Sequence, residues 1–263
     1  AFLSFYSVHT PLMARKDLKA KYQEKRKSSP PEAWGIEGER RVRLVQNHAV
    51  YAGMVEAMDQ AVGAVLDGLQ DLGLQDNTIV VFFSDNGGLS TSEGSPTSNL
   101  PLRAGKGWLY EGGIREPMIV RAPGVTSPGS KCTTPITSTD FYPTLLELAG
   151  LKSKPQQHLD GVSLLPLLKG QRSLEPRELF WHYPHYGNQG GQPGAAIRSG
   201  PWKLIEWYSS NKTELFRLDV DPGEQYDLAA QEPKRLEAMR EKLHKWQAEV
   251  GARFPSANPT WTD

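Results

Sequence analysis

The sequence predicts an α/β protein, with a mixed sheet flanked by helices and a small C-terminal antiparallel sheet that ends in a helix. Three observations lead to this prediction. Residues 78–83 form a short apolar run rich in β-branched and aromatic side chains. Residues 37–72, just before it, carry apolar side chains at three- and four-residue spacing, as a long helix does. Near the C-terminus, short alternating segments joined by Gly-Pro and Asn-Lys turns precede an amphipathic stretch.

Composition limits the classes of protein that this chain can belong to. It has 263 residues, no net charge and 38% hydrophobic residues, which is ample for a buried core and gives no reason to expect nucleic acid as a partner. No apolar run reaches the length of a membrane span. The single cysteine, Cys132, excludes an intrachain disulfide framework. Because the chain begins inside an apolar segment, we expect it to be a fragment, and the absence of a signal peptide decides nothing about secretion.

The first third of the chain is expected to supply one strand and two helices. Residues 2–8 predict a strand, and His9 follows it, where spacing alone favours a hydrogen-bonded loop histidine. Residues 15–27 are strongly basic, which favours a solvated helical face over a rim for an anionic polymer. Residues 37–72 predict one continuous helix, within which His48 is expected to be structural.

The central strand is expected to end at a cation site. Residues 78–83 are apolar on both faces and bounded by turn residues, which predicts a buried strand. Asp85 and Asn86 follow its carboxyl end, where open α/β sheets bind ligands. Their oxygens suit a hard cation such as calcium or magnesium. Gly87 and Gly88 permit the sharp turn that would aim both side chains at one point.

A polar loop and a glycine-flanked lysine come next. Residues 89–102 predict a loop over this site, and a flexible lid and a plain surface loop are equally compatible with its composition. Lys106 lies between two glycines, which alone would favour a surface lysine in a turn. Beside Asp85 and Asn86, it favours an ammonium group that neutralises an anionic oxygen. Residues 114–121 then predict a strand that Pro117 places at a sheet edge or at the strand start.

The second half predicts helices, a boundary and a small sheet. Asp140 is expected to cap a helix over residues 141–149. A change of composition near residues 172–177 predicts two domains, residues 1–175 and residues 176–263. The strands and helix expected after this boundary cover residues 195–198, 202–208, 214–218 and 232–250.

Two motifs together resemble a known family. Residues 83–88 read Phe-Ser-Asp-Asn-Gly-Gly, and residues 105–117 contain Gly-Lys-Gly and Glu-Gly-Gly-Ile-Arg-Glu-Pro. They resemble the sulfatase family of the alkaline-phosphatase superfamily, over nearly the whole chain but only for the later part of a sulfatase. The resemblance implies a partial alkaline-phosphatase-like sulfatase fold and a sulfuric ester hydrolase. It also implies a calcium ion, a formylglycine nucleophile, and a secreted or periplasmic location.

The resemblance also implies roles for individual residues. Asp85 and Asn86 would bind the calcium ion, whereas His9 and Lys106 would contact the sulfate group. His182 and His185 lie in an aromatic segment and would contact the substrate, because rings and imidazoles suit a sugar. Two histidines alone do not complete a zinc site. The expected partner is therefore a sulfated small molecule or glycan, with a carbohydrate sulfate favoured over an aryl sulfate.

Several parts of a sulfatase cannot be placed in this sequence. The family's formylglycine arises from cysteine or serine in Cys-x-Pro-x-Arg, whereas Cys132 is followed by Thr-Thr-Pro-Ile. No Asp-Asp pair is present to complete the metal shell. We therefore expect the nucleophile upstream of this chain and no turnover by the chain alone.

Two other functions remain open on the sequence. A phosphodiesterase or phosphonate hydrolase of the same superfamily would share the fold and similar metal chemistry, since fold alone does not decide the substrate. A non-catalytic protein that binds sulfated glycans would keep the anion-binding groups but lack a convertible cysteine or serine upstream.

Overall fold

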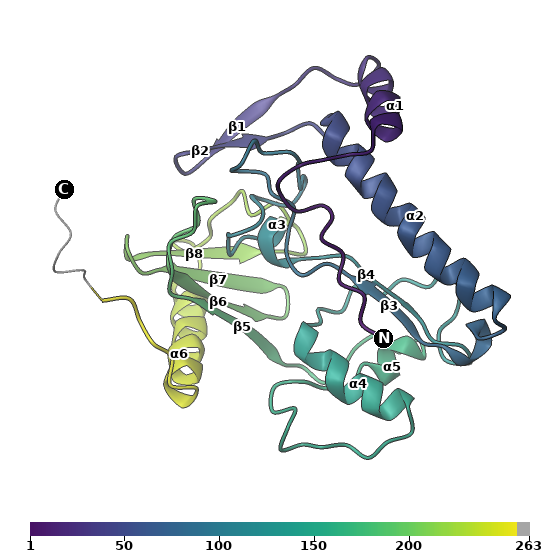
Figure 1. The fold of residues 1–263 in the computed structure, drawn as a ribbon. Coiled ribbons are helices and arrows are strands. Elements are labelled where there is room, and N and C mark those ends of the chain that lie inside the picture. The colour runs from purple at the N-terminus through teal and green to yellow at the C-terminus, as the bar shows by residue number, and fades with distance from the viewer. Residues whose placement is uncertain (257–263) are drawn as a thin grey trace. The chain divides into compact units, whose positions relative to one another are not determined.

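A computed structural model describes residues 1–256 (Figure 1), and the chain divides into two units. The first unit comprises Ala1–Gly68, Ser84–Pro117 and the chain from Phe180 onward. The second comprises Leu69–Phe83 and Met118–Leu179. All the candidate site residues belong to the first unit. The two-domain division at residue 175 stays a prediction.

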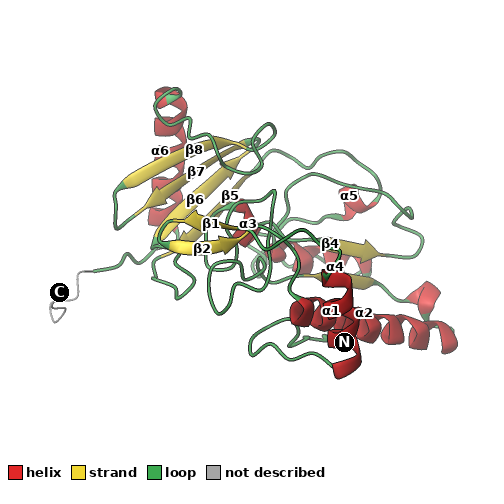
Figure 2. Cartoon of the chain, turned by 90° about the horizontal axis from the view of Figure 1, so that it is seen from above, coloured by secondary structure: helices red, strands yellow, loops and turns green. Residues whose placement is uncertain are grey.

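A four-stranded sheet forms the core of the first unit. Its strands lie in the order β5 (Glu178–Tyr183), β6 (Gly194–Ser199), β7 (Trp202–Trp207) and β8 (Lys212–Arg217), and β6–β7 and β7–β8 pair antiparallel. Figure 2 shows these strands side by side, with α6 (Pro233–Glu249) beside the sheet. Three of the strands and α6 confirm the predicted small sheet and terminal helix. The first strand, β5, was not predicted.

Each face of this sheet is covered by a different part of the first unit. Ile197, Leu204 and Leu215 pack with Met239 and Leu243 of α6. On the other face, the sheet packs against a buried segment that follows Lys106 and contains Trp108, Leu109 and Tyr110. The alternation of side chains along a strand explains how one sheet supports both layers. The Lys106 segment is thus held on the sheet by its own aromatic residues.

The predicted helix over residues 37–72 is wrong in its first part. Helix α2 runs only from Ala49 to Asp71, and the preceding residues form a hairpin of β1 (Trp34–Glu37) and β2 (Arg40–Arg43). Gly38 makes the turn at φ 56°, which glycine adopts without strain. The guanidinium groups of Arg41 and Arg43 lie 4.4 and 4.5 Å from the centre of the Trp34 ring. These cross-strand contacts override a periodicity that suits a helix.

The N-terminal strand predicted over residues 2–8 is also not formed. The segment has no regular structure, and Phe2 and Tyr6 are 83% and 70% exposed. A strand needs a partner for its backbone groups, and no described strand pairs with this segment. The basic segment does form a helix, α1 (Lys16–Arg26), with mostly exposed side chains, as predicted.

The second unit contains the central strand in a two-stranded pair. Strand β3 (Val80–Phe83) pairs antiparallel with β4 (Met118–Arg121), which begins directly after Pro117 as predicted. The pair is not buried on both faces, since Ile119 is 65% exposed and Phe83 is 37% exposed. A short 3₁₀ turn, η1 (Gln75–Asn77), leads into β3.

Asp140 does more in the second unit than cap a helix. It ends the 3₁₀ turn η2 (Ser138–Asp140), and α4 (Phe141–Leu148) follows, with α5 (Leu165–Leu168) further along the chain. Its side chain forms no cap bond to α4, which corrects the predicted role. Instead the buried carboxylate accepts hydrogen bonds from the backbone of Thr137 and Val162 and pairs with Arg177. Asp140 therefore ties distant segments of this unit together.

No helix in residues 1–256 combines the length and the apolar character needed to cross a membrane.

Candidate functional site

The two glycine-rich motifs lie against each other through their backbones. Gly87 N–H donates to the carbonyl oxygen of Gly113 at 3.1 Å, and Lys106 N–H donates to that of Gly88 at 3.2 Å. The side chain of Asn99 donates to the carbonyl of Gly88 at 2.8 Å. These bonds bring the turn after β3 beside the Lys106 segment, although about twenty residues separate them in sequence. The structure thus joins two motifs that the sequence could only place separately.

The glycines are needed for this close approach as well as for turning. A Cβ atom on Gly87 would lie 1.8 Å from the carbonyl oxygen of Gly112. A Cβ atom on Gly105 would lie 2.3 Å from the carbonyl oxygen of Gly88. Backbone atoms cannot rotate away as a side chain can, so any larger residue would separate the two motifs.

We expect Gly87→Ala to lower the free energy of unfolding by about 3 kcal/mol or more, the upper end of overpacking costs. Urea denaturation of the chain measures it. Gly63→Ala is the matched control, because a Cβ there meets nothing within 4 Å and Gly63 lies inside α2. Alanine should stabilise that helix by about 0.5–1 kcal/mol. Equal, small changes in the free energy of unfolding for the two substitutions would contradict the close approach of Gly87 to the Gly112 carbonyl.

Asp85 and Asn86 present free oxygen donors in this turn. Asp85 is exposed and Asn86 is half-buried, and neither side chain has a hydrogen-bond partner among residues 1–256. Ser84 fixes the turn by donating from its hydroxyl to the Asn86 carbonyl at 2.9 Å. The buried Oε1 atom of Glu116 has no hydrogen-bond partner among the described residues, and burial together with the Asp85 charge raises the pKa of Glu116 to about 7. A cation here would offset this excess of negative charge.

These residues therefore fit a hard cation, but they do not complete its shell. Calcium takes six to eight oxygen ligands, whereas Asp85 and Asn86 supply two side chains. Within the described residues, no group of three or more histidine, cysteine or acidic side chains is placed to hold a metal ion. The donor set suits one part of a cation site.

Lys106, on the second glycine-rich motif, presents an ammonium group without an ion-pair partner. It is half-buried, and its ammonium group forms no ion pair in the described part of the chain. The next residue, Gly107, has φ 85° and lies against Gly191, whose Cβ would come within 1.7 Å of the Gly107 carbonyl oxygen. Trp108 Nε1 donates to the carbonyl of Gln189 at 3.2 Å. The loop after β5 therefore packs directly on the turn that carries Lys106.

His9 reaches the same region through its neighbour. Its ring is exposed, and Nδ1 lies 2.8 Å from the Thr10 carbonyl oxygen. The Thr10 hydroxyl donates to Glu93, which also accepts from Asn188 at 2.9 Å. Both hydrogen bonds hold the pKa of Glu93 below its usual range, and the charges of His9 and Lys106 lower it further. The two predicted sulfate-binding residues thus both lie near one carboxylate.

The two predicted substrate histidines differ in their surroundings. His182 on β5 has both ring nitrogens in contact, Nδ1 with the Tyr208 hydroxyl at 2.7 Å and Nε2 with the Arg253 carbonyl at 2.9 Å. His185 is exposed in the loop after β5, edge-on to the Tyr183 ring. Their substrate roles stay predictions.

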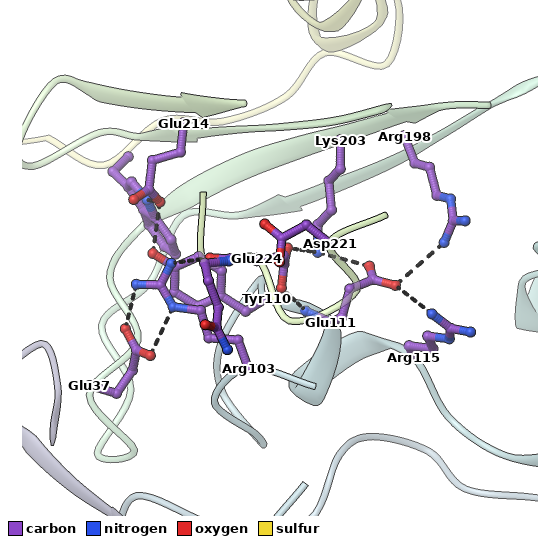
Figure 3. Close-up of polar contacts among 12 residues, drawn as sticks. Glu37, Arg103, Tyr110, Glu111, Arg115, Arg198, Lys203, Glu214, Asp221 and Glu224 are labelled. Atoms are coloured by element: carbon purple, nitrogen blue, oxygen red, sulfur yellow. Dashed lines mark hydrogen bonds and ion pairs between the residues drawn. The ribbon is translucent and has the colours of Figure 1, made fainter. Parts of the chain in front are cut away.

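A buried ion network that the sequence did not reveal anchors the Lys106 segment (Figure 3). Lys203 on β7 is fully buried, and its ammonium lies 3.0 Å from Glu111 Oε1 and 2.8 Å from Glu224 Oε1. Glu111 opens the short helix α3 (Glu111–Ile114), and its backbone N–H donates to Glu224 at 2.6 Å. Arg115 and Arg198 also pair with Glu111, at 3.7 and 3.4 Å. Glu111 is thus the ion-pair partner of Arg115.

Arg103 has a structural position too. Its guanidinium binds both carboxylate oxygens of Glu37 on β1, at 2.9 and 2.8 Å, and the Glu224 carbonyl at 3.0 Å (Figure 3). It also lies over the Tyr110 ring, 3.8 Å from its centre. The sequence signals Lys203 alone of this network by a charge inside an apolar strand, since Glu37 and Glu224 lie in polar stretches.

The structure is that of an α/β protein in which two glycine-rich motifs meet through their backbones. A family model described as "Sulfatase" matches residues 1–151, and one described as "N-sulphoglucosamine sulphohydrolase, C-terminal" matches residues 104–250. The chain belongs to the sulfatase family.

Known proteins agree with this family and with the predicted fold class. A "Sulfatase" of Formosa agariphila is 37% identical over 94% of this chain and 45% of its own length. Human arylsulfatase A is 34% identical over 75% of this chain and 43% of its own length. The crystal structure of Ps i-CgsB in complex with k-i-k-neocarrahexaose matches with a TM-score of 0.71 and 32% identity, over 91% of this chain and 48% of that chain. The chain spans about half the length of these relatives, and its fold is the alkaline-phosphatase-like fold of the sulfatases, in part.

Proposed function

We propose that this chain is the later part of an enzyme that hydrolyses sulfate esters. The observation that carries the proposal is the backbone contact between the two glycine-rich motifs. It brings the turn that carries Asp85 and Asn86 against the segment that carries Lys106, and these three side chains are unpaired among the described residues. A sulfate ester carries negative oxygens, which a cation and an ammonium group can neutralise together. Membership of the sulfatase family supports the same chemistry.

In this proposal, Asp85 and Asn86 hold part of a calcium shell, and the remaining ligands come from outside this chain. Calcium would supply positive charge that draws the sulfate and the nucleophile together. Lys106 binds a sulfate oxygen, and His9 donates a hydrogen bond to the sulfate or moves a proton. The formylglycine nucleophile lies outside these 263 residues.

We further propose that the substrate is a carbohydrate sulfate. The Ps i-CgsB structure, at 32% identity, is in complex with k-i-k-neocarrahexaose, whose name denotes a six-unit sugar. The exposed imidazole of His185 and the aromatic residues beside it suit the hydroxyls and faces of a sugar. His182 is the second proposed contact, reached only if a ligand displaces one of its present partners. A secreted or periplasmic location would fit such a substrate.

The test is an assay of the complete protein on sulfated sugars, 4-nitrophenyl sulfate and a phosphonate monoester. We expect turnover of a sulfated sugar, and none by the 263-residue chain alone. Lys106→Ala should lower kcat/KM by about 10²–10³, as the loss of one oxyanion donor does. Lys19→Ala, an exposed lysine of α1, is the control and should leave kcat/KM unchanged.

Three results would contradict the proposal. Preference for the phosphonate would assign the protein to phosphonate or phosphodiester hydrolysis. Tight binding of sulfated sugars without turnover would indicate a non-catalytic glycan-binding protein. Equal effects of the two lysine substitutions would remove Lys106 from the site.

A further inference from the structure

Glu93 holds together the segments that surround the candidate site. Its Oε2 accepts a hydrogen bond from the Thr10 hydroxyl, next to His9, and its Oε1 accepts one from Asn188 Nδ2 at 2.9 Å. Asn188 belongs to the loop that packs on the turn carrying Lys106. Glu93 therefore lies where the His9 segment, the Lys106 segment and the loop after β5 meet.

The chain holds Glu93 in an unusual backbone conformation while leaving it exposed. Its φ is 50°, in the left-handed region that residues other than glycine rarely adopt, and Ser95 follows with φ 43°. Such conformations persist only when surrounding contacts enforce them, and they gather at ligand-binding positions. Two side-chain bonds from distant segments enforce this one, yet Glu93 remains exposed to solvent. The carboxylate is thus both fixed and accessible.

The chemistry of the carboxylate limits what can bind next to it. An ionised carboxylate has about four lone-pair positions, and Thr10 and Asn188 occupy one on each oxygen. The free positions can accept a hydrogen bond from a hydroxyl or an amino group. A sulfate group has no proton to donate and carries a charge of the same sign, so it is repelled.

We propose that Glu93 determines specificity at the substrate position beside the sulfate ester, accepting a hydrogen bond from a hydroxyl or amino group and disfavouring a second sulfate. Its bonds to Thr10, the residue after His9, and to Asn188, in the loop packed on the turn that carries Lys106, place this carboxylate near the proposed sulfate position. The inference rests on the proposed sulfatase function and adds a substrate class. That class is a sugar with one sulfate next to a free hydroxyl or amino group.

The experiment compares Glu93→Gln with wild type in the complete protein. The probes are galactose, glucosamine and N-acetylgalactosamine, each as the monosulfates and as the disulfate. Glutamine keeps the shape of glutamate, and its amide can meet both Thr10 and Asn188, so only the charge is lost. For each sugar that wild type hydrolyses, we expect the preference for monosulfate over disulfate to fall about ten-fold, mainly through a higher kcat/KM on the disulfate.

Two further variants separate the charge from the structural tie. Glu93→Ala removes both, and should also lower kcat/KM on the monosulfate because the three segments lose their link. Glu39→Gln, at an exposed hairpin turn, makes the same change in net charge and should leave the preference unchanged.

Two outcomes of Glu93→Gln would overturn the inference. An unchanged preference would show that the charge does not select substrates. An equal change in kcat/KM on the monosulfate and the disulfate of one sugar would show that Glu93 acts on the reacting ester instead. Absence of turnover of every sulfate ester by wild type is a different result, since it overturns the proposed function and this inference with it.

Discussion

Replacing Lys203 with methionine is expected to lower the free energy of unfolding by about 3–5 kcal/mol. The ammonium of Lys203 is fully buried between Glu111 and Glu224, and methionine fills similar space without charge. The cost arises because two carboxylates then stay in the interior without their shared partner. Chemical denaturation of the 263-residue chain at neutral pH measures it.

Lys212→Met is the matched control for this substitution. Lys212 lies on the neighbouring strand β8 and pairs with Glu214 at 2.6 Å, but its side chain is 58% exposed. An exposed pair contributes about 0–1 kcal/mol, so this change should have a small effect. A comparable loss in both variants would show that the buried network does not stabilise the fold more than a surface pair.

The pH dependence of the Lys203→Met effect gives a second check. Burial already raises the pKa of Glu224, and Lys203 is the main group that opposes this rise. Without Lys203, the folded carboxylate binds a proton more readily than the unfolded one, so the folded variant gains stability as pH falls. The difference in the free energy of unfolding between Lys203→Met and wild type should therefore narrow as the pH falls from about 7 to about 5. If the difference in unfolding free energy stays constant over that range, Glu224 is not left as an uncompensated buried carboxylate in the variant.

Asp85→Ala is expected to abolish both turnover and calcium binding in the complete protein. Asp85 offers the only proposed side-chain carboxylate of this chain to the cation, and its oxygens have no other described partner. We expect kcat to fall by at least about 10³, because a lost metal removes its charge from the reacting sulfate. Calorimetric titration with calcium provides a readout that does not depend on turnover.

The control for Asp85→Ala is Asp67→Ala, which removes an exposed carboxylate from α2. It should leave calcium affinity and kcat unchanged. Normal calcium affinity in Asp85→Ala would show that the free oxygens of this turn serve another purpose. Asn86→Ala should weaken calcium binding less, because it removes a neutral ligand instead of a charged one.

Local sequence determined the elements whose patterns do not depend on distant residues. The apolar run before Asp85, the proline before β4, and the one-sided apolar pattern of α6 each predicted an element that is present. The two glycine-rich motifs indicated the sulfatase family, and the family model agrees. The site residues on them were also named from the sequence, and their roles await the experiments above.

Only the tertiary structure decided the rest, because the deciding contacts join residues far apart in sequence. Residues 37–48 have a spacing that suits a helix, but residues 34–43 form a hairpin instead. Its Trp34 and buried Arg43 are in contact, and Arg43 donates to the distant Ser95 carbonyl. Lys203 lies 92 residues from its partner Glu111, so no local pattern could pair them. A buried charge is stable only where folding supplies its partner. Glu93 likewise gains its place from Thr10 and Asn188, which the folded chain alone brings together.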